Sequence, residues 1–185
     1  MNIFVLDENP ITAARMMCDK HIPKMVVESA QMMASVVRRW GATDEQMPLT
    51  KAGKPYKGGY ANHPCTLWAG DSFGNFSWLH DHACALLSQY TTRFGKAHAC
   101  AEPIAQLWHI SPYLGSTGVA KTPFALAMPD EHRPIACHIK EGYLHHATAP
   151  EAVKAYRSYY HSKTFAKWEK GIPAPDWWQG AEVAA

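Results

Sequence analysis

Residues 18–31 read Cys18-Asp19-Lys20-His21-Ile22-Pro23-Lys24-Met25-Val26-Val27-Glu28-Ser29-Ala30-Gln31. At helical spacing, His21, Lys24, Glu28 and Gln31 follow one another by three, four and three residues, so they form a single polar stripe. Apolar residues flank this stretch as far as Trp40, which predicts a mostly buried helix. Buried polar side chains need partners. The stripe therefore indicates either a polar functional site or the solvated face of an amphipathic helix, with Lys24 and Glu28 as an ion pair.

The composition is that of a globular protein. The chain has 185 residues, of which 47% are hydrophobic and 18% charged, and its net charge is +2. This length is sufficient for one domain with a hydrophobic core, and we expect residues 1–185 to form a single helical domain. A net charge this small excludes a strong polyelectrolyte, so binding of nucleic acid would need a local basic patch.

The pattern along the chain predicts a mainly α protein, a compact bundle-like fold with long irregular loops rich in Pro and Gly. Pro23 is expected to kink or divide the first helical region, because proline removes a helical hydrogen bond. The predicted order is a short strand or extended segment at 3–6, helical residues 10–40, a loop at 41–61, a helix at 65–90, a short helix at 101–110, an irregular stretch at 111–134 and a last helix at 149–170.

Cysteine usage and the first residues indicate a cytoplasmic protein. Five cysteines are scattered without a Cys-x-x-Cys pair, which suggests reduced thiols. The start of the chain has no basic region followed by a long apolar run, so neither a signal peptide nor a membrane helix is predicted.

The polar stripe supplies candidates for catalysis. Asp19 and Glu28 are candidate general bases, His21 is a candidate acid or base, and Lys24 is a candidate phosphate or oxyanion binder. His63 is a further candidate, since the sequence Asn-His-Pro at 62–64 lies between a glycine-rich loop and a predicted helix. Asn62 could alternatively cap that helix.

Basic and aromatic residues supply candidates for binding DNA. Arginine matches phosphate geometry, and aromatic rings interleaved with cations suit bases and phosphates together. The positions of the basic residues also have structural explanations. They could lie on a solvated loop, at a helix C-terminus, or on a core helix whose lysines reach to solvent. The candidates are Lys20, Gln31, Lys54, Lys57, Asn62, Trp68, Arg93, Lys96, Tyr156, Arg157, Tyr160 and Lys163.

Metal and cofactor motifs are weak or absent. No His-Glu-x-x-His, Walker A, Rossmann or Gly-x-Ser-x-Gly pattern occurs, so no cofactor is expected. His80 and His82 flank Asp81, but they lack the spacing of a helical zinc pair. We therefore predict no metal site.

Several motifs in order resemble a family of tailed-phage proteins, over nearly the whole chain. They are Met-Asn-Ile-Phe-x-Leu-Asp at 1–7, Cys-Asp-Lys-His-x-x-Lys-Met at 18–25, Asn-His-Pro at 62–64 followed by Trp68, Tyr90 with Arg-Phe-Gly-Lys at 93–96 and His98, Pro-Phe at 123–124 with Ala-Met-Pro at 127–129, and Tyr-Arg-x-Tyr-Tyr at 156–160 with Lys163 and Lys-Trp at 167–168. The family is similar to the amino acid:DNA transferases, also called α-glutamyl/putrescinyl thymine pyrophosphorylases.

This resemblance implies a helical enzyme that modifies phage DNA in the cytoplasm of the host cell. An amine, such as the α-amino group of an amino acid, would displace pyrophosphate from activated 5-hydroxymethyluracil. Lys20, Lys24, Arg93 and Arg157 would neutralise the leaving group. Asp19, Glu28, His21 or His63 would act as the base. A flipped base would lie against Trp68, Tyr156 or Tyr160.

Two alternatives remain open from the sequence. The first is a DNA glycosylase or lyase, which also flips bases and uses a Lys or an Asp. The second is a nucleic-acid-binding protein without enzymatic activity. The small net charge argues against the second, and the polar stripe in an apolar helix favours an enzyme.

Overall fold

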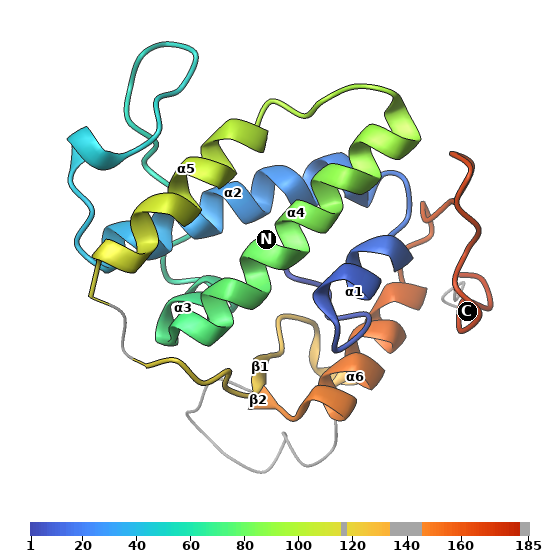
Figure 1. Cartoon of the computed structure of the whole chain (residues 1–185). Helices are drawn as coiled ribbons and strands as arrows, with labels where there is room; N and C mark the ends of the chain where they lie inside the picture. Colours follow the sequence, from blue (N-terminus) through green and yellow to red (C-terminus); the bar gives the residue numbers. More distant parts are fainter. Residues whose placement is uncertain (116–117, 134–145, 182–185) are drawn as a thin grey trace.

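The computed structural model describes residues 1–115, 118–133 and 146–181 and is mainly helical (Figure 1). The helices and strands are α1 (Pro10–Met16), α2 (His21–Arg39), η1 (Asp44–Gln46), α3 (Pro64–Asp71), α4 (Phe73–Phe94), α5 (Ala101–Ile110), η2 (Ser111–Tyr113), β1 (Phe124–Ala125), η3 (Asp130–His132), β2 (His146–Ala147) and α6 (Ala149–His161). This confirms the predicted fold class. None of the helices described is long and apolar enough to span a bilayer.

The first helical region divides before Pro23, not at it as predicted. Helix α1 ends at Met16, and α2 begins at His21. Pro23 is then the third residue of α2, where a backbone N–H has no intrahelical acceptor and proline costs little. The break turns the chain so that the polar stripe lies on a helix separate from α1. Residues 3–6 form neither a helix nor a strand.

Helix α2 supplies the centre of the core. Its fully buried residues, among them Ile22, Val26 and Met33, pack in a cluster with side chains from α1, α3, α4 and α5. In Figure 1, α4 crosses in front of α2, and α1 packs against α4. The apolar face of α2 therefore faces the other helices, as its sequence predicted, while the polar stripe occupies the remaining face.

The single helix predicted for residues 65–90 is two helices. Ser72 ends α3 and caps α4, and its side chain accepts a hydrogen bond from the Asn75 N–H. Asn62 does not cap α3. The residue in that position is His63, whose Nδ1 accepts from the Cys65 N–H at 3.2 Å. A ring nitrogen thus satisfies a free donor of the first turn.

The C-terminal part of the chain folds back against the N-terminal segment. Helix α6 ends at His161, well short of the predicted residue 170. A two-stranded antiparallel sheet, which the sequence did not predict, pairs Phe124 with Ala147 beside α6. Within α6, Tyr156 and Tyr160 are fully buried against the core. This packing brings the end of α6 to the polar stripe of α2.

Candidate functional site

A pocket lies where the polar stripe of α2 meets the N-terminal segment and the end of α6. Its volume is about 190 Å³, below the roughly 300–1,000 Å³ of pockets for drug-sized ligands. Its size suits a single small group such as one base. The residues that line it are Met1, Asn2, Phe4, His21, Lys24, Glu28, Tyr159, Lys163 and Phe165.

Glu28 lies in this pocket among hydrogen-bond donors. Its carboxylate accepts from the Asn2 backbone N–H at 2.8 Å and lies 3.7 Å from both the Met1 amino group and Lys24 Nζ. The Glu28 side chain is 12% exposed and that of Met1 is fully covered, whereas Met1 as a residue is partly exposed. The exposed part of Met1 is therefore its backbone. A primary amine and a carboxylate thus share one small pocket.

His21 is held in one tautomer by Tyr160. The Tyr160 hydroxyl accepts from the Cys18 N–H at 2.9 Å and lies 2.8 Å from His21 Nδ1, and both side chains are buried. If Nδ1 donated, the buried Tyr160 hydrogen would have no acceptor. Hydrogen-bond accounting therefore assigns Tyr160 as the donor, so neutral His21 carries its proton on Nε2, and that N–H is the polar group the ring brings to the pocket lining.

The charge of His21 is fixed by its surroundings. Burial, followed by the positive charges of Lys24, Lys163 and Lys20, lowers the pKa of His21 to about 3. The imidazole is consequently neutral at physiological pH. It can donate a hydrogen bond from Nε2, but it is a poor proton acceptor, because protonation would place another positive charge beside the three lysines. The roles predicted for His21, as an acid or as a base, remain predictions.

Aromatic rings form the walls of the pocket. Phe4 stacks on His21, with ring centroids 4.7 Å apart, and on Tyr159 at 5.8 Å. The Phe4 backbone has φ +38°, which is uncommon for a residue with a side chain. Phe165, which is 38% exposed, meets the His21 ring edge-on at 5.2 Å. A planar ligand would find apolar ring faces here and polar groups at Glu28 and His21.

Lysines surround the pocket. Lys20 Nζ lies 4.6 Å from the Phe165 ring centroid, and Lys163 Nζ lies 3.4 Å from that of Tyr159. The Lys24 side chain is 62% exposed. Three cations around a small pocket create a positive potential that attracts the phosphates of a nucleic acid.

His63 and Gln31 lie beside the pocket on its α2 side. The pKa of His63 is lowered by burial and then by the positive charge of the chain's N-terminus, so His63 lies near the Met1 amine. The Gln31 side chain lies under Gly59, where an added Cβ would be 3.6 Å from Gln31 Cβ and Cδ. Residues that precede α3 therefore lie close to the polar stripe of α2 at Gln31 and to the chain's N-terminus at His63.

Residues 1–102 match the family model described as pyrimidine dimer DNA glycosylase. The chain belongs to that family. No curated protein matches the chain, and no solved structure matches it. The matched residues include α2, the Met1–Glu28 contact and His63, so the family region contains most of the pocket. The description of this family points to an enzyme that acts on pyrimidines in DNA.

Asp19 does not line this pocket. Its carboxylate pairs with Arg93 at 3.0 Å and accepts from the Glu169 N–H at 2.6 Å. The Arg93 guanidinium also donates to the carbonyls of Met17 and Arg15. Because these contacts join α1, α4 and the C-terminal segment, they have a structural explanation. The roles predicted for Asp19 in catalysis and for Arg93 in anion binding remain predictions.

Three aromatic candidates are core residues. Trp68, Tyr156 and Tyr160 are fully buried. The Tyr156 hydroxyl donates to the Ala125 carbonyl at 2.8 Å. Because these three rings are buried, DNA could not reach their faces in this structure. The pocket is lined instead by the rings of Phe165 and Tyr159. Tyr160 contributes indirectly, through its bond to His21.

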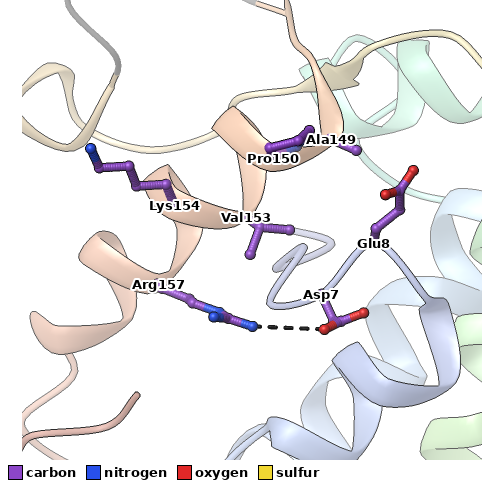
Figure 2. Close-up of a pocket in the computed structure, with 7 residues that line it drawn as sticks. All are labelled: Asp7, Glu8, Ala149, Pro150, Val153, Lys154 and Arg157. Atoms are coloured by element: carbon purple, nitrogen blue, oxygen red, sulfur yellow. Dashed lines mark ion pairs between the residues drawn. The ribbon is translucent and has the colours of Figure 1, made fainter.

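Arg157 belongs to a different cavity, shown in Figure 2. It donates to the Leu6 carbonyl at 2.9 Å and lies 3.7 Å from Asp7. Lys154 lines the same cavity. The remaining cationic candidates are exposed: Lys54 and Lys57 on the loop before α3, and Lys96 just after α4. Lys57 lies next to the two glycines that pack on α2, and Lys54 lies farther along the loop. Asn62 is exposed beside His63.

The sequence reasoning missed most of the pocket residues that come from outside α2, although Lys163 was among its candidates. Met1, Phe4, Tyr159 and Phe165 are brought there by packing of distant segments. Met1, Phe4 and Tyr159 fall in motifs that were informative only through the resemblance. No helical or strand spacing connects them with the stripe. Among the described residues, no group of three or more His, Cys, Asp or Glu side chains is placed to hold a metal ion.

Proposed function

We propose that this chain removes a pyrimidine base from DNA and that the amine beside Glu28 is the nucleophile. One observation carries the proposal: the Met1 amino group lies 3.7 Å from the Glu28 carboxylate in a pocket suited to one small planar group. Membership of a DNA glycosylase family supports the same chemistry. An α-amino group is less basic than a lysine side chain, so more of it is unprotonated and nucleophilic near neutral pH.

The reaction follows from these two groups. Glu28 accepts a proton from the ammonium form of the amine, whose lone pair then attacks C1′ of the deoxyribose. The glycosidic C1′–N bond breaks, and the base leaves with its electron pair and takes up the proton that Glu28 accepted, which returns Glu28 to its carboxylate form. Opening of the sugar ring moves a proton from the attached nitrogen to the ring oxygen and leaves a protonated imine between C1′ and the amine, whose positive charge the Glu28 carboxylate stabilises. Water hydrolyses the imine and releases the amine.

The other pocket residues suit this reaction. The Nε2–H of His21 is a neutral donor for a carbonyl oxygen of the base or for the sugar oxygen. Lys20, Lys24 and Lys163 contact phosphates on either side of the extruded nucleotide. The base stacks on the ring of Phe165, which is partly exposed at the pocket. Of these residues, His21, Lys24, Lys163 and Phe165 line the pocket, so their roles need no rearrangement of the core.

A second candidate is the transfer of an amino acid or other amine onto pyrophosphorylated 5-hydroxymethyluracil in phage DNA. The three lysines around His21 favour it, because a pyrophosphate leaving group needs several cations. In that reaction Glu28 would deprotonate an amine that enters with the donor. Both candidates place an amine beside Glu28, and they differ in whether the amine belongs to the protein.

Borohydride trapping tests the proposal. The protein is incubated with duplex DNA carrying a thymine dimer, and sodium borohydride reduces any imine to a stable covalent adduct. We expect an adduct whose tryptic peptide contains the α-amino group, and its loss in Glu28→Gln. Glu102→Gln is the matched control, since Glu102 is an exposed carboxylate of α5 that accepts from Gln106. The intact mass of the purified protein identifies the residue that bears the α-amino group.

The other outcomes separate the alternatives. An adduct at Lys24 or Lys163 would refute the assignment of the nucleophile. Absence of an adduct, together with a new thymidine derivative when the DNA carries pyrophosphorylated 5-hydroxymethyluracil and amino acids are added, would favour the transferase. Unchanged nucleosides with intact DNA binding would leave a binding protein without this activity.

A further inference from the structure

Tyr60 is an exposed aromatic residue in an unfavourable backbone conformation. Its φ is +53°, in the left-handed region that side chains other than those of Asn and Asp rarely adopt. It is 68% exposed, so burial of the ring does not compensate for the conformation. Residues held this way are concentrated at functional sites. The contacts on both sides of Tyr60 show how it is held.

The chain just before Tyr60 is fixed to α2. The Ser35 hydroxyl donates to the Gly59 carbonyl at 3.1 Å and accepts from the Gly59 N–H at 2.9 Å. A Cβ at Gly58, where φ is +77°, would lie 2.3 Å from Ser35 Oγ. Only glycine permits this approach. The chain after Tyr60 closes a turn, because the His63 N–H donates to the Tyr60 carbonyl at 2.9 Å. The base of the Tyr60 side chain is therefore firmly positioned.

This turn packs on the part of α2 that follows Glu28. Gly59 packs over Gln31, and Gln31 follows Glu28 by three residues, about 4.5 Å along the helix axis. At the other end of the turn, His63 lies close enough to the chain's N-terminus for that charge to affect its titration. Lys57 is exposed three residues before Tyr60, where it can meet a phosphate. A duplex held over the pocket would reach Tyr60.

We propose that Tyr60 inserts its ring into duplex DNA and occupies the space left in the base stack when a nucleotide enters the Glu28 pocket. The inference rests on the proposed function, since it requires an extruded nucleotide. Extrusion costs unstacking energy, and an inserted apolar or aromatic wedge offsets part of that cost. A ring held outward on a fixed turn suits this role because it loses little freedom when it binds.

The test is fluorescence of 2-aminopurine placed next to the target nucleotide, measured with DNA binding by anisotropy. We expect Tyr60→Ala to lower the extruded population by about 5- to 150-fold, the range that stacking on one base supplies. Tyr60→Phe keeps the ring and should retain the signal. Leu49→Ala is the matched control, because Leu49 is 60% exposed on the same loop and should leave extrusion unchanged.

The outcomes distinguish this inference from the proposed function. Glu28→Gln should extrude the nucleotide normally yet form no trapped adduct. Equal fluorescence in Tyr60→Ala and the unsubstituted protein, with adduct formation intact, would overturn the wedge and leave the glycosylase standing. Equal losses in Tyr60→Ala and Leu49→Ala would also overturn it, since the effect would then belong to the loop as a whole.

Discussion

The buried His82 makes stability depend on pH in a way that can be calculated. His82 is fully buried on α4 and stacks on Trp78, with ring centroids 5.0 Å apart. Neither of its ring nitrogens has a hydrogen-bond partner in the described part of the chain. Burial lowers its pKa to about 3, because an imidazolium there would lose its hydration without gaining a partner.

The sign of the effect follows from proton binding. Between the unfolded pKa of 6.5 and the folded pKa of about 3, the unfolded chain binds a proton at His82 and the folded chain does not. The folded state therefore loses stability as the pH falls below 6.5. Between pH 7.5 and pH 5, His82 alone lowers the free energy of unfolding by about 2 kcal/mol. His21, whose pKa is also lowered to about 3, adds a similar amount.

Urea unfolding at the two pH values measures this quantity. His82→Leu should reduce the difference between pH 7.5 and pH 5 by about 2 kcal/mol, leaving the remaining groups to titrate. Leu79→Ala is the control: Leu79 is fully buried on the same helix, and its loss should cost about 2–5 kcal/mol equally at both pH values. If His82→Leu keeps the full pH dependence of the unsubstituted protein, His82 is not a buried neutral histidine and the argument fails.

Three further predictions concern one contact of the pocket and two buried groups outside it. Tyr160→Phe leaves the His21 ring and the Cys18 N–H without a partner, so the free energy of unfolding should fall by about 1–3 kcal/mol for each group. The pH profile of adduct formation should also shift, because His21 is no longer held in one tautomer, and an unchanged profile would count against the tautomer assignment. Arg93→Met breaks a buried ion pair and should cost about 3–5 kcal/mol in urea unfolding, whereas a loss below about 1 kcal/mol, the range of an exposed pair, would show that the pair is not structural. Burial raises the pKa of Cys65 to about 12, so iodoacetamide at pH 8 followed by peptide mapping should label exposed Cys84 and leave Cys65 unmodified until the protein is denatured.

The helices could be predicted from the sequence, but their ends could not. Hydrophobic spacing indicated the helical regions of α1 to α6 because that signal extends over many residues. The breaks depend on single residues: Ser72 ends α3 and caps α4, and Pro23 is accommodated because α2 begins only two residues before it. A proline in a first turn and one in a helix interior look alike in sequence until the start of the helix is known.

The candidate site was predictable mainly where its residues share a helix, although Lys163, which also lines the pocket, was a candidate from the basic and aromatic pattern near the last helix. His21, Lys24 and Glu28 were found because three- and four-residue spacing places them on one face. Asp19 belongs to the same stretch of sequence, but it precedes the helix and its direction is set by Arg93. Phe165 and Tyr159 reach the pocket through the packing of α6, and no local pattern in the sequence carries that information. Trp68 had the expected chemistry, but its burial depends on the complete fold.

The charged groups of the pocket differ in exposure, and this difference fits separate roles in phosphate binding and in the proposed reaction. Lys24 is largely exposed, so it can meet phosphates that stay in water. Glu28 is the acidic residue that lines the pocket, and it is mostly covered, so its carboxylate is available to stabilise positive charge at a sugar carbon. His21 stays neutral because Tyr160 bonds to Nδ1 and burial disfavours its cation. A protonated His21 would weaken that stabilisation by adding positive charge near Glu28. Its neutrality therefore follows from the same packing that forms the pocket. A neutral His21 leaves the negative potential of Glu28 undiminished, as the proposed attack by an amine requires.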